Sequence, residues 1–501
     1  MTSQHLALWG PKISGSNNSA TQAFERNFHK LLYNHSQDAI AISDGVQTRT
    51  FGELIAEVAN RRDALMQSWR SSDSPFLPLL INRTLDSCLT LISCLCYQIP
   101  FALIAPESPT DRVEQILSKL RGVDSDLAGN DSVSASYRAP SGRNSFVVTS
   151  SGSTGTPKAI KISFTTHFDR MMLDSQRGTT IRKRESRIVT VLLGTPTSVS
   201  GVNTLSKVFL GQTVHILDPI RLPMAALVSA IESLGVTRLR LPAQLARLMA
   251  DFSNPQGIKL ASVEEVKIGG ESVFFETLES LKKYFREDVQ FVHTIGATEA
   301  LGLANNRFSL NEIERQGQVP LGTLSAGVKL VQVPHLGHSV YELVASELLA
   351  EGYLGEPQLT SKNFFVDESG TRRWRSGDLV VKTSTGEIMH CGRIDDVVKI
   401  NGTVASPTET TRAIIDWPEV AQAITLPHKS LGKTFLVSHV EPKKIEIFDI
   451  KKLREFLSTK LPPHLRPAQI VLHNKIPSKE GGKIDRAQLR NWNVVSDSSP
   501  K

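Results

Sequence analysis

The stretch TSSGSTGTPK, from Thr149 to Lys158, is the most informative segment of this 501-residue chain. It follows FVVT, a short apolar run ending at Thr149 that is typical of a buried strand. Its glycines allow backbone N–H groups to approach an anion, and its Ser and Thr hydroxyls add further donors. Because a lysine closes the segment, we expect a loop that binds a polyphosphate.

Two common phosphate-binding patterns do not describe this segment. In a Walker loop the lysine directly follows a glycine and precedes Ser or Thr, whereas Lys158 follows Pro157 and precedes Ala159. The dinucleotide pattern G-x-G-x-x-G does not fit either. Taken alone, the segment is also compatible with a Ser- and Gly-rich linker, so its interpretation depends on the rest of the chain.

Composition places the chain among large globular proteins. Its length predicts two to four domains, and its 40% hydrophobic residues are ample for buried cores. A disordered chain or a disulfide scaffold is excluded by this composition. Four cysteines, Cys88, Cys94, Cys96 and Cys391, contain one close pair but lack a second pair at zinc-ligand spacing. We therefore expect buried free thiols in a reducing compartment.

One stretch resembles a membrane span in length. Residues 88–105 carry no charge, but Gln98 and Pro100 interrupt them, which favours a buried helix ending before Pro100 and then a buried strand. The N-terminus has no basic start followed by an apolar core, so we expect no secretory signal. The prediction is a soluble cytoplasmic protein without a membrane span.

Short β-branched runs alternate with helical patterns through the middle of the chain. RIVTVLL (187–193), TRLRL (237–241) and VEEVKI (263–268) predict strands, and residues 224–234 between them predict a helix. Such alternation is typical of an α/β fold with mostly parallel sheets layered with helices. From Asp396 onward, short strands and a single clear helix predict a small α+β unit of about a hundred residues.

Seven further blocks, together with the Thr149–Lys158 segment, resemble the adenylate-forming superfamily of AMP-binding enzymes. This superfamily includes acyl- and aryl-CoA synthetases and nonribosomal-peptide adenylation domains. The blocks occur in the family's order and cover roughly residues 45–490. They are Thr50–Leu65, Leu80–Leu117, Ile268–Ser272, Ile295–Gly302, Arg375–Val380, Gly392–Glu409 and Gly481–Leu489.

The resemblance implies a large N-terminal domain, residues 1–394, that binds ATP and an acid. It also implies a mobile C-terminal lid, residues 395–501, that carries the catalytic lysine. The implied ATP-binding residues are Ser150, Ser151, Gly152, Ser153, Thr154, Gly155, Lys158, Gly269, Gly270, Glu271, Ile295, Gly296, Ala297, Asp378 and Arg393.

Five residues receive specific roles from the resemblance. Glu299 would hold Mg²⁺ on the triphosphate, and Thr298 would donate to the α-phosphate. Asp378 would accept from both ribose hydroxyls, with Arg393 as a second ribose contact. Lys483 would bridge the attacking carboxylate and the α-phosphate, where a positive group stabilises developing charge. Outside their motifs, such residues would usually be only solvated surface charges.

Three residues fall where the family places its hinge and its acceptor tunnel. Asp395 corresponds to the hinge, for which an exposed loop carboxylate is the simpler interpretation. Lys399 and Gly402 follow in the segment that lines the pantetheine tunnel. After Arg486 the chain runs only to Lys501, so we expect no carrier domain in cis.

Several positions depart from the family's common pattern. Ile295 replaces the usual Tyr or Phe, as in benzoate- and anthranilate-type CoA ligases, and weakens stacking on adenine. Ala159 replaces a Gly, and Phe164 lies near a position where His is frequent. Ser198 occupies the substrate-pocket position at which amino-acid-activating members carry an Asp. A buried ammonium without a carboxylate is unfavourable, so we expect a neutral-tailed carboxylic acid rather than an α-amino acid.

The resemblance thus implies ATP-dependent formation of an acyl-AMP from an aryl or acyl acid. The acyl group would pass to the thiol of CoA or of a phosphopantetheinyl carrier protein in trans. Transfer to an amine or a hydroxyl is the first alternative, and a degenerate, non-catalytic nucleotide-binding protein is the second.

The charge balance fits small anionic partners rather than nucleic acid. Of the formal net charge of +7, residues 396–501 supply 17 Lys and Arg against 11 Asp and Glu. A basic C-terminal unit can steer ATP, CoA or an acidic carrier protein towards the site. A solvated basic face is the simpler explanation of the same charges.

Overall fold

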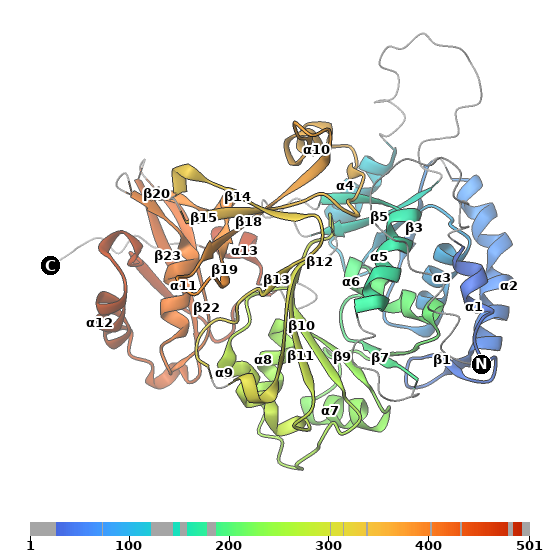
Figure 1. Ribbon diagram of the computed structural model, residues 1–501, viewed down its shortest axis with the longest axis horizontal. Helices are drawn as coiled ribbons and strands as arrows, with labels where there is room; N and C mark the ends of the chain where they lie inside the picture. The colour runs from blue at the N-terminus through green and yellow to red at the C-terminus, as the bar shows by residue number, and fades with distance from the viewer. Residues whose placement is uncertain are drawn as a thin grey trace, which may run out of the picture.

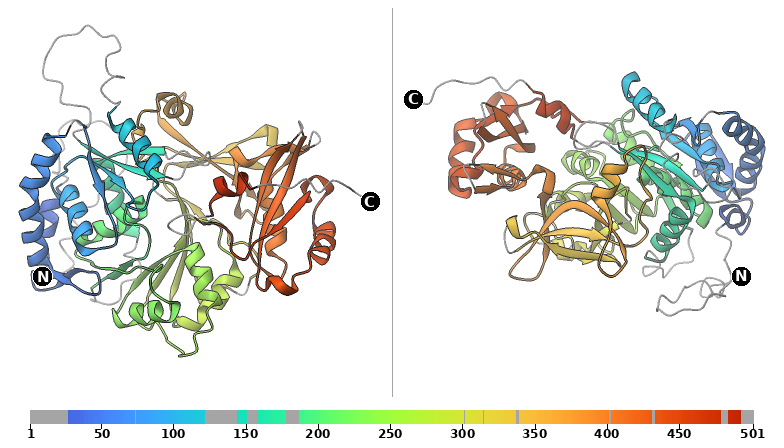
Figure 2. Two further views of the ribbon diagram at one scale, coloured as in Figure 1. Left: turned by 180° about the vertical axis from the view of Figure 1, so that it is seen from behind. Right: turned by 90° about the horizontal axis from the view of Figure 1, so that it is seen from above.

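Three sheets organise the larger part of the chain, and a separate group of strands forms the C-terminal part (Figure 1). The computed structural model describes residues 27–72, 74–121, 144–150, 158–177, 187–300, 302–313, 315–336, 339–400, 403–430, 433–478 and 484–492. The C-terminal strands and helices lie at the end of the molecule opposite α1–α3, as both views in Figure 2 confirm.

The largest sheet has the strand order β13-β12-β11-β10-β9-β7-β8-β1-β2. The strands from β1 through β8, β7, β9 and β10 to β11 are parallel, and β2, β12 and β13 are antiparallel. Their bounds are β1 Ile40–Ser43, β2 Thr48–Thr50, β7 Val189–Leu192, β8 Thr213–Ile216, β9 Arg238–Pro242, β10 Glu265–Gly269, β11 Gln290–Gly296, β12 Gly302–Ser309 and β13 Thr323–Leu324.

One face of this sheet is buried by three amphipathic helices. Val266 and Ile268 of β10 pack in one core with α7 (Met224–Ser233), α8 (Ala243–Asp251) and α9 (Phe275–Leu281). Because side chains alternate along a strand, Lys267 and Gly269 face the opposite side of the sheet. The strand and helix predictions for residues 187–268 are thereby confirmed.

The second sheet has the order β16-β6-β5-β4-β3, with β3, β4 and β5 parallel and β6 and β16 antiparallel. Helix α2 begins at a recognisable signal, because Thr50 caps it and forms a capping box with Glu53. The bounds are β3 Leu77–Leu80, β4 Phe101–Ile104, β5 Ser145–Ser150, β6 Lys158–Ser163, β16 Gly352–Tyr353, α1 Phe28–Leu32, α2 Phe51–Arg70, α3 Leu85–Cys96, α4 Thr110–Arg121, α5 Phe164–Arg177, α6 Val199–Leu205, η4 Ser206–Leu210 and α10 Pro357–Asn363.

The uncharged stretch at residues 88–105 is a helix followed by a strand, as predicted. Helix α3 ends before Pro100, and β4 follows as a fully buried strand. Cys88, Cys94 and Cys96 are buried free thiols, whereas Cys391 is only half-buried. None of the described helices is both long enough and apolar enough to cross a bilayer.

The third sheet departs from the expectation of mostly parallel sheets. Its order is β14-β15-β18-β17, with β19 on β18, and every pairing is antiparallel. Short connections explain this, since antiparallel neighbours need only a tight turn. Gly386, with φ +84°, occupies the turn between β18 and β19. The bounds are β14 Val328–Gln332, β15 Val340–Ala345, β17 Phe364–Val366, β18 Arg372–Lys382 and β19 Ile388–Arg393.

The C-terminal part is a small α+β unit with an apolar core of its own. Strands β22, β23 and β24 form its sheet, and Leu436, Leu453 and Leu457 lie in its core. The boundary between residues 394 and 395 remains a prediction. The bounds are η8 Ile394–Asp396, β20 Val398–Ile400, β21 Thr403–Ala405, α11 Pro407–Ile415, β22 Val420–Ser430, β23 Lys433–Pro442, α12 Ile450–Lys460, β24 Gln469–Leu472 and α13 Arg486–Arg490.

Two buried histidines predict an acid-sensitive fold. Burial lowers the pKa of His167 to about 3, and burial beside His473 and His428 lowers the pKa of His439 to about 4. The unfolded chain takes up these protons near pH 6.5 and the folded chain does not, so stability falls as pH drops from about 6.5 towards 4. Each residue should contribute on the order of 2 kcal/mol of this loss at pH 5.

Urea denaturation at pH 7.5 and pH 5.0 measures the effect. His439→Gln should reduce the difference between the two free energies of unfolding. An unchanged difference in that variant, with wild-type-like stability at pH 7.5, would contradict the assignment.

Candidate active site

The polyphosphate-loop candidate joins two paired strands. Ser150, at the end of β5, is the register partner of Lys158, at the start of β6. Residues 151–157, with Ser151, Gly152, Ser153, Thr154 and Gly155 among them, lie outside the described part of the chain, as does the side chain of Ser150. The ammonium of Lys158 lies 5.4 Å from the centre of the Tyr353 ring. This cation–π contact places Lys158 beside Tyr353 of β16.

The two other nucleotide-loop candidates lie at the ends of neighbouring parallel strands. Gly269 of β10 pairs with Thr294 of β11, one residue before Ile295. A Cβ atom on Gly269 would lie 2.5 Å from the Thr294 carbonyl oxygen, so only glycine fits there. Gly270 has φ +98°, which also requires glycine. The carboxyl ends of adjacent parallel strands are where α/β sheets bind ligands.

The residues next to these glycines differ in their contacts and in their exposure to solvent. Glu271 forms an ion pair with Arg247 of α8 at 2.6 Å. Ile295 is half-buried against the main core, whereas Gly296 is exposed and Ala297 is half-buried. The main chain at Gly296 is therefore open to an incoming ligand.

Arg170 fixes the turn that contains Thr298 and Glu299. Its guanidinium donates to the Thr298 carbonyl at 3.1 Å, to the Glu299 carbonyl at 3.0 Å and to the Leu348 carbonyl at 2.7 and 2.9 Å. Arg170 is 1% exposed. Burial lowers the pKa of Arg170 to about 10, so it remains charged at neutral pH. One buried cation thus joins α5 to two separate loops.

The Glu299 carboxylate is held from the other side by an aromatic pair. Tyr353 donates its hydroxyl to Glu299 Oε1 at 2.9 Å, and Trp374 Nε1 lies 3.4 Å from the same hydroxyl. Burial and the charge of Glu299 raise the pKa of Tyr353, so the hydroxyl stays a donor. Because Lys158 lies over the Tyr353 ring, the structure brings the lysine and the carboxylate predicted from separate motifs to one aromatic side chain.

Asp378 and Arg393 meet across adjacent strands. They are register partners in β18 and β19, and Arg393 Nη1 donates to Asp378 Oδ1 at 3.0 Å. His390 Nε2 lies 3.5 Å from the same oxygen. Burial opposes ionisation of Asp378, but His390 and Arg393 outweigh it and hold its pKa below the ordinary value. Asp378 is therefore a charged acceptor at neutral pH.

The group formed by Glu299 and Tyr353 lies near the pair formed by Asp378 and Arg393. Burial opposes the charge of Arg393, but Asp378, Asp395, Asp396 and Glu299 together raise its pKa. Trp374 of β18 contacts the Tyr353 hydroxyl and so joins the two groups. The structure brings Lys158, Glu299, Asp378 and Arg393 into one region, near the start of β6, the end of β11 and the paired strands β18 and β19.

The remaining candidates have varied surroundings. Asp395 is 49% exposed in its side chain and lies 3.8 Å from Arg393 Nη2. Lys399 lies in β20, opposite Val404, but its side chain is not described, and Gly402 and Lys483 lie outside the described residues. Ser198 caps α6, accepting from the Gly201 N–H and donating to the Thr195 carbonyl.

Two charged contacts were not predicted from the sequence. Arg170 lies in the sequence HFDRMM, and a single arginine among apolar residues at helical spacing was a usable signal. Asp396 is 5% exposed and pairs with Arg486 and, at 2.9 Å, with Arg490. This contact ties α13, which follows the GGK segment, to the start of the C-terminal part.

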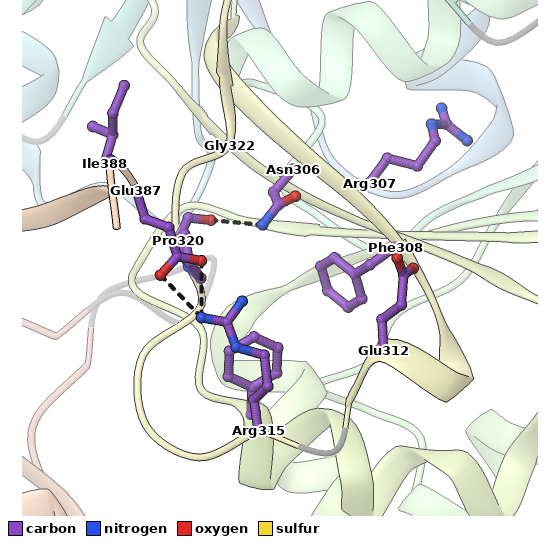
Figure 3. Close-up of a pocket in the computed structure, with 11 residues that line it drawn as sticks. Asn306, Arg307, Phe308, Glu312, Arg315, Pro320, Gly322, Glu387 and Ile388 are labelled. Atoms are coloured by element: carbon purple, nitrogen blue, oxygen red, sulfur yellow. Dashed lines mark hydrogen bonds and ion pairs between the residues drawn. The ribbon is translucent and has the colours of Figure 1, made fainter. Parts of the chain in front are cut away.

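A separate pocket of about 260 Å³ lies towards the other end of β12 (Figure 3). Its polar groups are engaged with one another, since Arg315 contacts Glu387 at 2.8 Å and Asn306 donates to the Pro320 carbonyl. Arg307 points away from it, towards Glu265. The pocket's lining residues on β12, Asn306 to Phe308, lie four to six residues from Gly302, the register partner of Gly296, which is about 14–20 Å along the strand. None of the predicted site residues that the structure describes lines it.

Comparison with known sequences finds AMP-binding enzymes and nonribosomal peptide synthetases. The profile of the family described as "AMP-binding enzyme" matches residues 121–353. The chain is 25% identical over 496 residues to the probable non-canonical nonribosomal peptide synthetase CymA of Salinispora arenicola, covering 92% of this chain and 6% of CymA. The chain spans 6 to 14% of the length of several such synthetases.

Solved structures show the same fold. The anthranilate CoA ligase AuaEII, in complex with anthranoyl-AMP, has a TM-score of 0.74 at 16% identity and covers 93% of this chain and 96% of its own. The amide bond synthetase McbA from Marinactinospora thermotolerans also has a TM-score of 0.74 at 16% identity, covering 93% and 99%.

Replacement of Arg170 should destabilise the protein more than its surface counterpart does. In Arg170→Lys a single ammonium cannot reach all three carbonyls, so buried acceptors lose their donors and the free energy of unfolding should fall by about 2–4 kcal/mol. Urea denaturation measures this, with Arg221→Lys as control because Arg221 is 88% exposed in its side chain. Equal stability of the two variants would contradict the role of Arg170.

Proposed function

Because this chain belongs to the adenylate-forming superfamily of AMP-binding enzymes, we propose that it activates a carboxylic acid with ATP. In this reaction a carboxylate oxygen attacks the α-phosphorus of ATP. The bond between that phosphorus and the bridging oxygen to the β-phosphate breaks, pyrophosphate leaves, and acyl-AMP forms.

One observation carries the proposal: residues from four separate motifs converge on one region. Lys158 and Glu299 both contact Tyr353, and the Tyr353 hydroxyl also contacts Trp374 of β18, the strand in which Asp378 pairs with Arg393. These residues are more than two hundred positions apart at the extremes. A set of unrelated surface charges would not be expected to gather in this way.

Each residue has a chemical role in this proposal. Lys158 and the segment Ser150–Gly155 would bind the triphosphate, and Thr298 would donate to the α-phosphate. Asp378 would accept from the ribose hydroxyls, because Arg393 engages only its Oδ1. The main chain of Gly269–Glu271 and Ile295–Ala297 would border the adenine. Arg170 would position Thr298 and Glu299 without touching the substrate.

Glu299 fits the requirements of a Mg²⁺ ligand. Magnesium in nucleotide sites is held by one or two carboxylates together with substrate phosphates. Glu299 is 9% exposed, and Tyr353 engages its Oε1. Within the described ranges no cluster of three or more potential metal ligands occurs. Bound Mg²⁺ would neutralise charge on the triphosphate.

The C-terminal unit would act as a lid over this site. Residues 395–501 would swing about Asp395 and bring Lys483 to the α-phosphate, where its charge offsets repulsion between carboxylate and phosphate. The separate core of this unit supports motion as one body. The ion pairs of Asp396 with Arg486 and Arg490 would carry α13 along with it. The net positive charge of this part would favour approach of anionic substrates.

In a second step the acyl group would pass to a thiol of CoA or of a carrier protein in trans. The thiolate would attack the acyl carbon and displace AMP, near Lys399 and Gly402. Similarity to peptide synthetases and to a CoA ligase supports a thiol acceptor. Equal similarity to an amide bond synthetase supports an amine as the alternative.

Pyrophosphate exchange into ATP, tested against a panel of carboxylic acids, examines the first step. Asp378→Asn should raise the KM for ATP at least about tenfold, because it replaces a charged acceptor by a neutral one. Lys483→Ala should lower kcat at least about a hundredfold, the effect expected when one electrostatic contact to the transition state is lost.

Asp251→Asn is the matched control, since Asp251 is exposed at the end of α8 and lies outside every motif. Full exchange by the Lys483 variant would overturn its assigned role. Absence of exchange with every acid, in a folded wild-type protein, would overturn the enzymatic proposal.

A further inference from the structure

Four charged side chains meet on the face of the large sheet opposite α7–α9. Asp174 of α5 accepts from Lys207 of η4 at 2.5 Å and from Lys267 of β10 at 3.2 Å. Arg240 of β9 is the register partner of Lys267, so both side chains leave the sheet on the same face. The site described above uses none of these residues.

Two separate elements, β10 and α5, connect these residues to the candidate active site. Lys267 precedes Gly269 by two residues, a distance of about 7 Å along a strand. Asp174 follows Arg170 by one helical turn, about 6 Å along the axis, and Arg170 contacts Thr298 and Glu299. The cluster therefore lies one layer of side chains behind the segments that would border acyl-AMP.

The substrate-pocket candidate adjoins the same cluster. Arg240 Nη1 lies 3.5 Å from the hydroxyl of Ser200, two residues after Ser198. The start of α6 and the charged cluster therefore face one another. An acid held with its carboxylate at Gly296 and Thr298 would direct its tail between them.

These side chains remain open to solvent although they belong to the interior of the fold. The side chains of Asp174, Lys267 and Lys207 retain 28%, 24% and 12% of their exposure. Lys267 lies in the central part of a parallel sheet, with β9 on one side and β11 on the other. Solvent therefore reaches the Lys267 side chain from this face of the sheet, although its strand is a central one.

The charges of these four side chains do not balance. Both oxygens of Asp174 are taken by lysines. Burial opposes ionisation of Asp174, but Lys207, Lys267 and Arg240 outweigh it and lower its pKa well below the ordinary value. Three cations therefore face one carboxylate. Among the described residues no carboxylate lies within ion-pair distance of Arg240, whose one hydrogen bond, to Ser200, is long.

We propose that the acid activated by this protein carries a second carboxylate, which binds between Arg240 and Lys267. The inference rests on the proposed function and replaces the neutral tail expected from the sequence. A guanidinium presents a planar fork of donors that matches a carboxylate. The incoming anion would also compensate the excess of positive charge.

The spacing sets the length of the substrate. Lys267 is the register partner of Val292, which precedes Gly296 by four residues, about 13 Å along the strand, so at least a benzene ring or about four methylene groups must separate the two carboxylates. A shorter diacid such as malonate cannot reach both places.

Matched pairs of acids test this inference without any variant. Terephthalate and adipate are compared with their monomethyl esters, which keep the skeleton and remove one charge. In wild-type pyrophosphate exchange, kcat/KM should be at least about tenfold higher for the diacid, the discrimination expected of one charge-assisted hydrogen bond. Equal or faster exchange with the monoesters would overturn the inference while leaving the proposed function intact.

Variants then assign the preference to the cluster. Arg240→Met and Lys267→Met should raise the KM for the diacid at least about tenfold and leave kinetics with the monoester, and kcat, nearly unchanged. Arg221→Met is the control, because Arg221 is 88% exposed on the surface. An unchanged diacid-to-monoester ratio in both folded variants would contradict the assignment.

Binding without turnover separates the two proposals. Terephthalate alone should raise the melting temperature of the wild-type protein more than its monomethyl ester does, and Arg240→Met should abolish that difference. No exchange with any acid would overturn the proposed function and, with it, this inference.

Discussion

The buried guanidinium of Arg170 is the constraint on which the candidate site depends. It contacts the carbonyls of Thr298, Glu299 and Leu348 and is almost fully removed from solvent. A charge in such surroundings is tolerated only when its donors are satisfied. Leu348, with φ +51°, has a left-handed backbone that is rare for leucine, and the same guanidinium holds its carbonyl. The position of the turn after β11 is therefore set from behind by α5.

The contacts of Arg170 are all to main-chain carbonyls, so they do not occupy the side chains of Thr298 and Glu299. Arg170 occupies the backbone carbonyls, and Tyr353 occupies one oxygen of the Glu299 carboxylate. The Glu299 carboxylate lies at the hydroxyl of Tyr353, whose ring also contacts Lys158. One helical turn further along α5, Asp174 organises the lysines of the proposed tail site. A single helix thus connects the proposed reaction centre with the proposed selectivity for the acid.

The sequence predicted the strands and helices of the large sheet because their apolar periodicity is strong, as in β9, α7 and β10. It did not predict the antiparallel third sheet, since β-branched runs indicate strands but not their direction. Motif order placed Asp378 and Glu299 in one site. Their mutual contacts with Arg393 and Tyr353 depend on register and loop geometry, which single-chain patterns do not contain. The cluster at Asp174 was missed for the same reason, because its members are scattered over α5, η4, β9 and β10.

The central claim is that a carboxylate oxygen of the substrate becomes bonded to the α-phosphorus of ATP. An acid labelled with ¹⁸O in its carboxylate, incubated with the protein, Mg²⁺, ATP and an acceptor, tests this claim most directly. Acyl transfer from acyl-AMP leaves one labelled oxygen on AMP, and mass spectrometry of the nucleotide should detect it. Label in inorganic phosphate, with ADP as the nucleotide product, would contradict the account, as would unlabelled AMP formed in step with acid consumption.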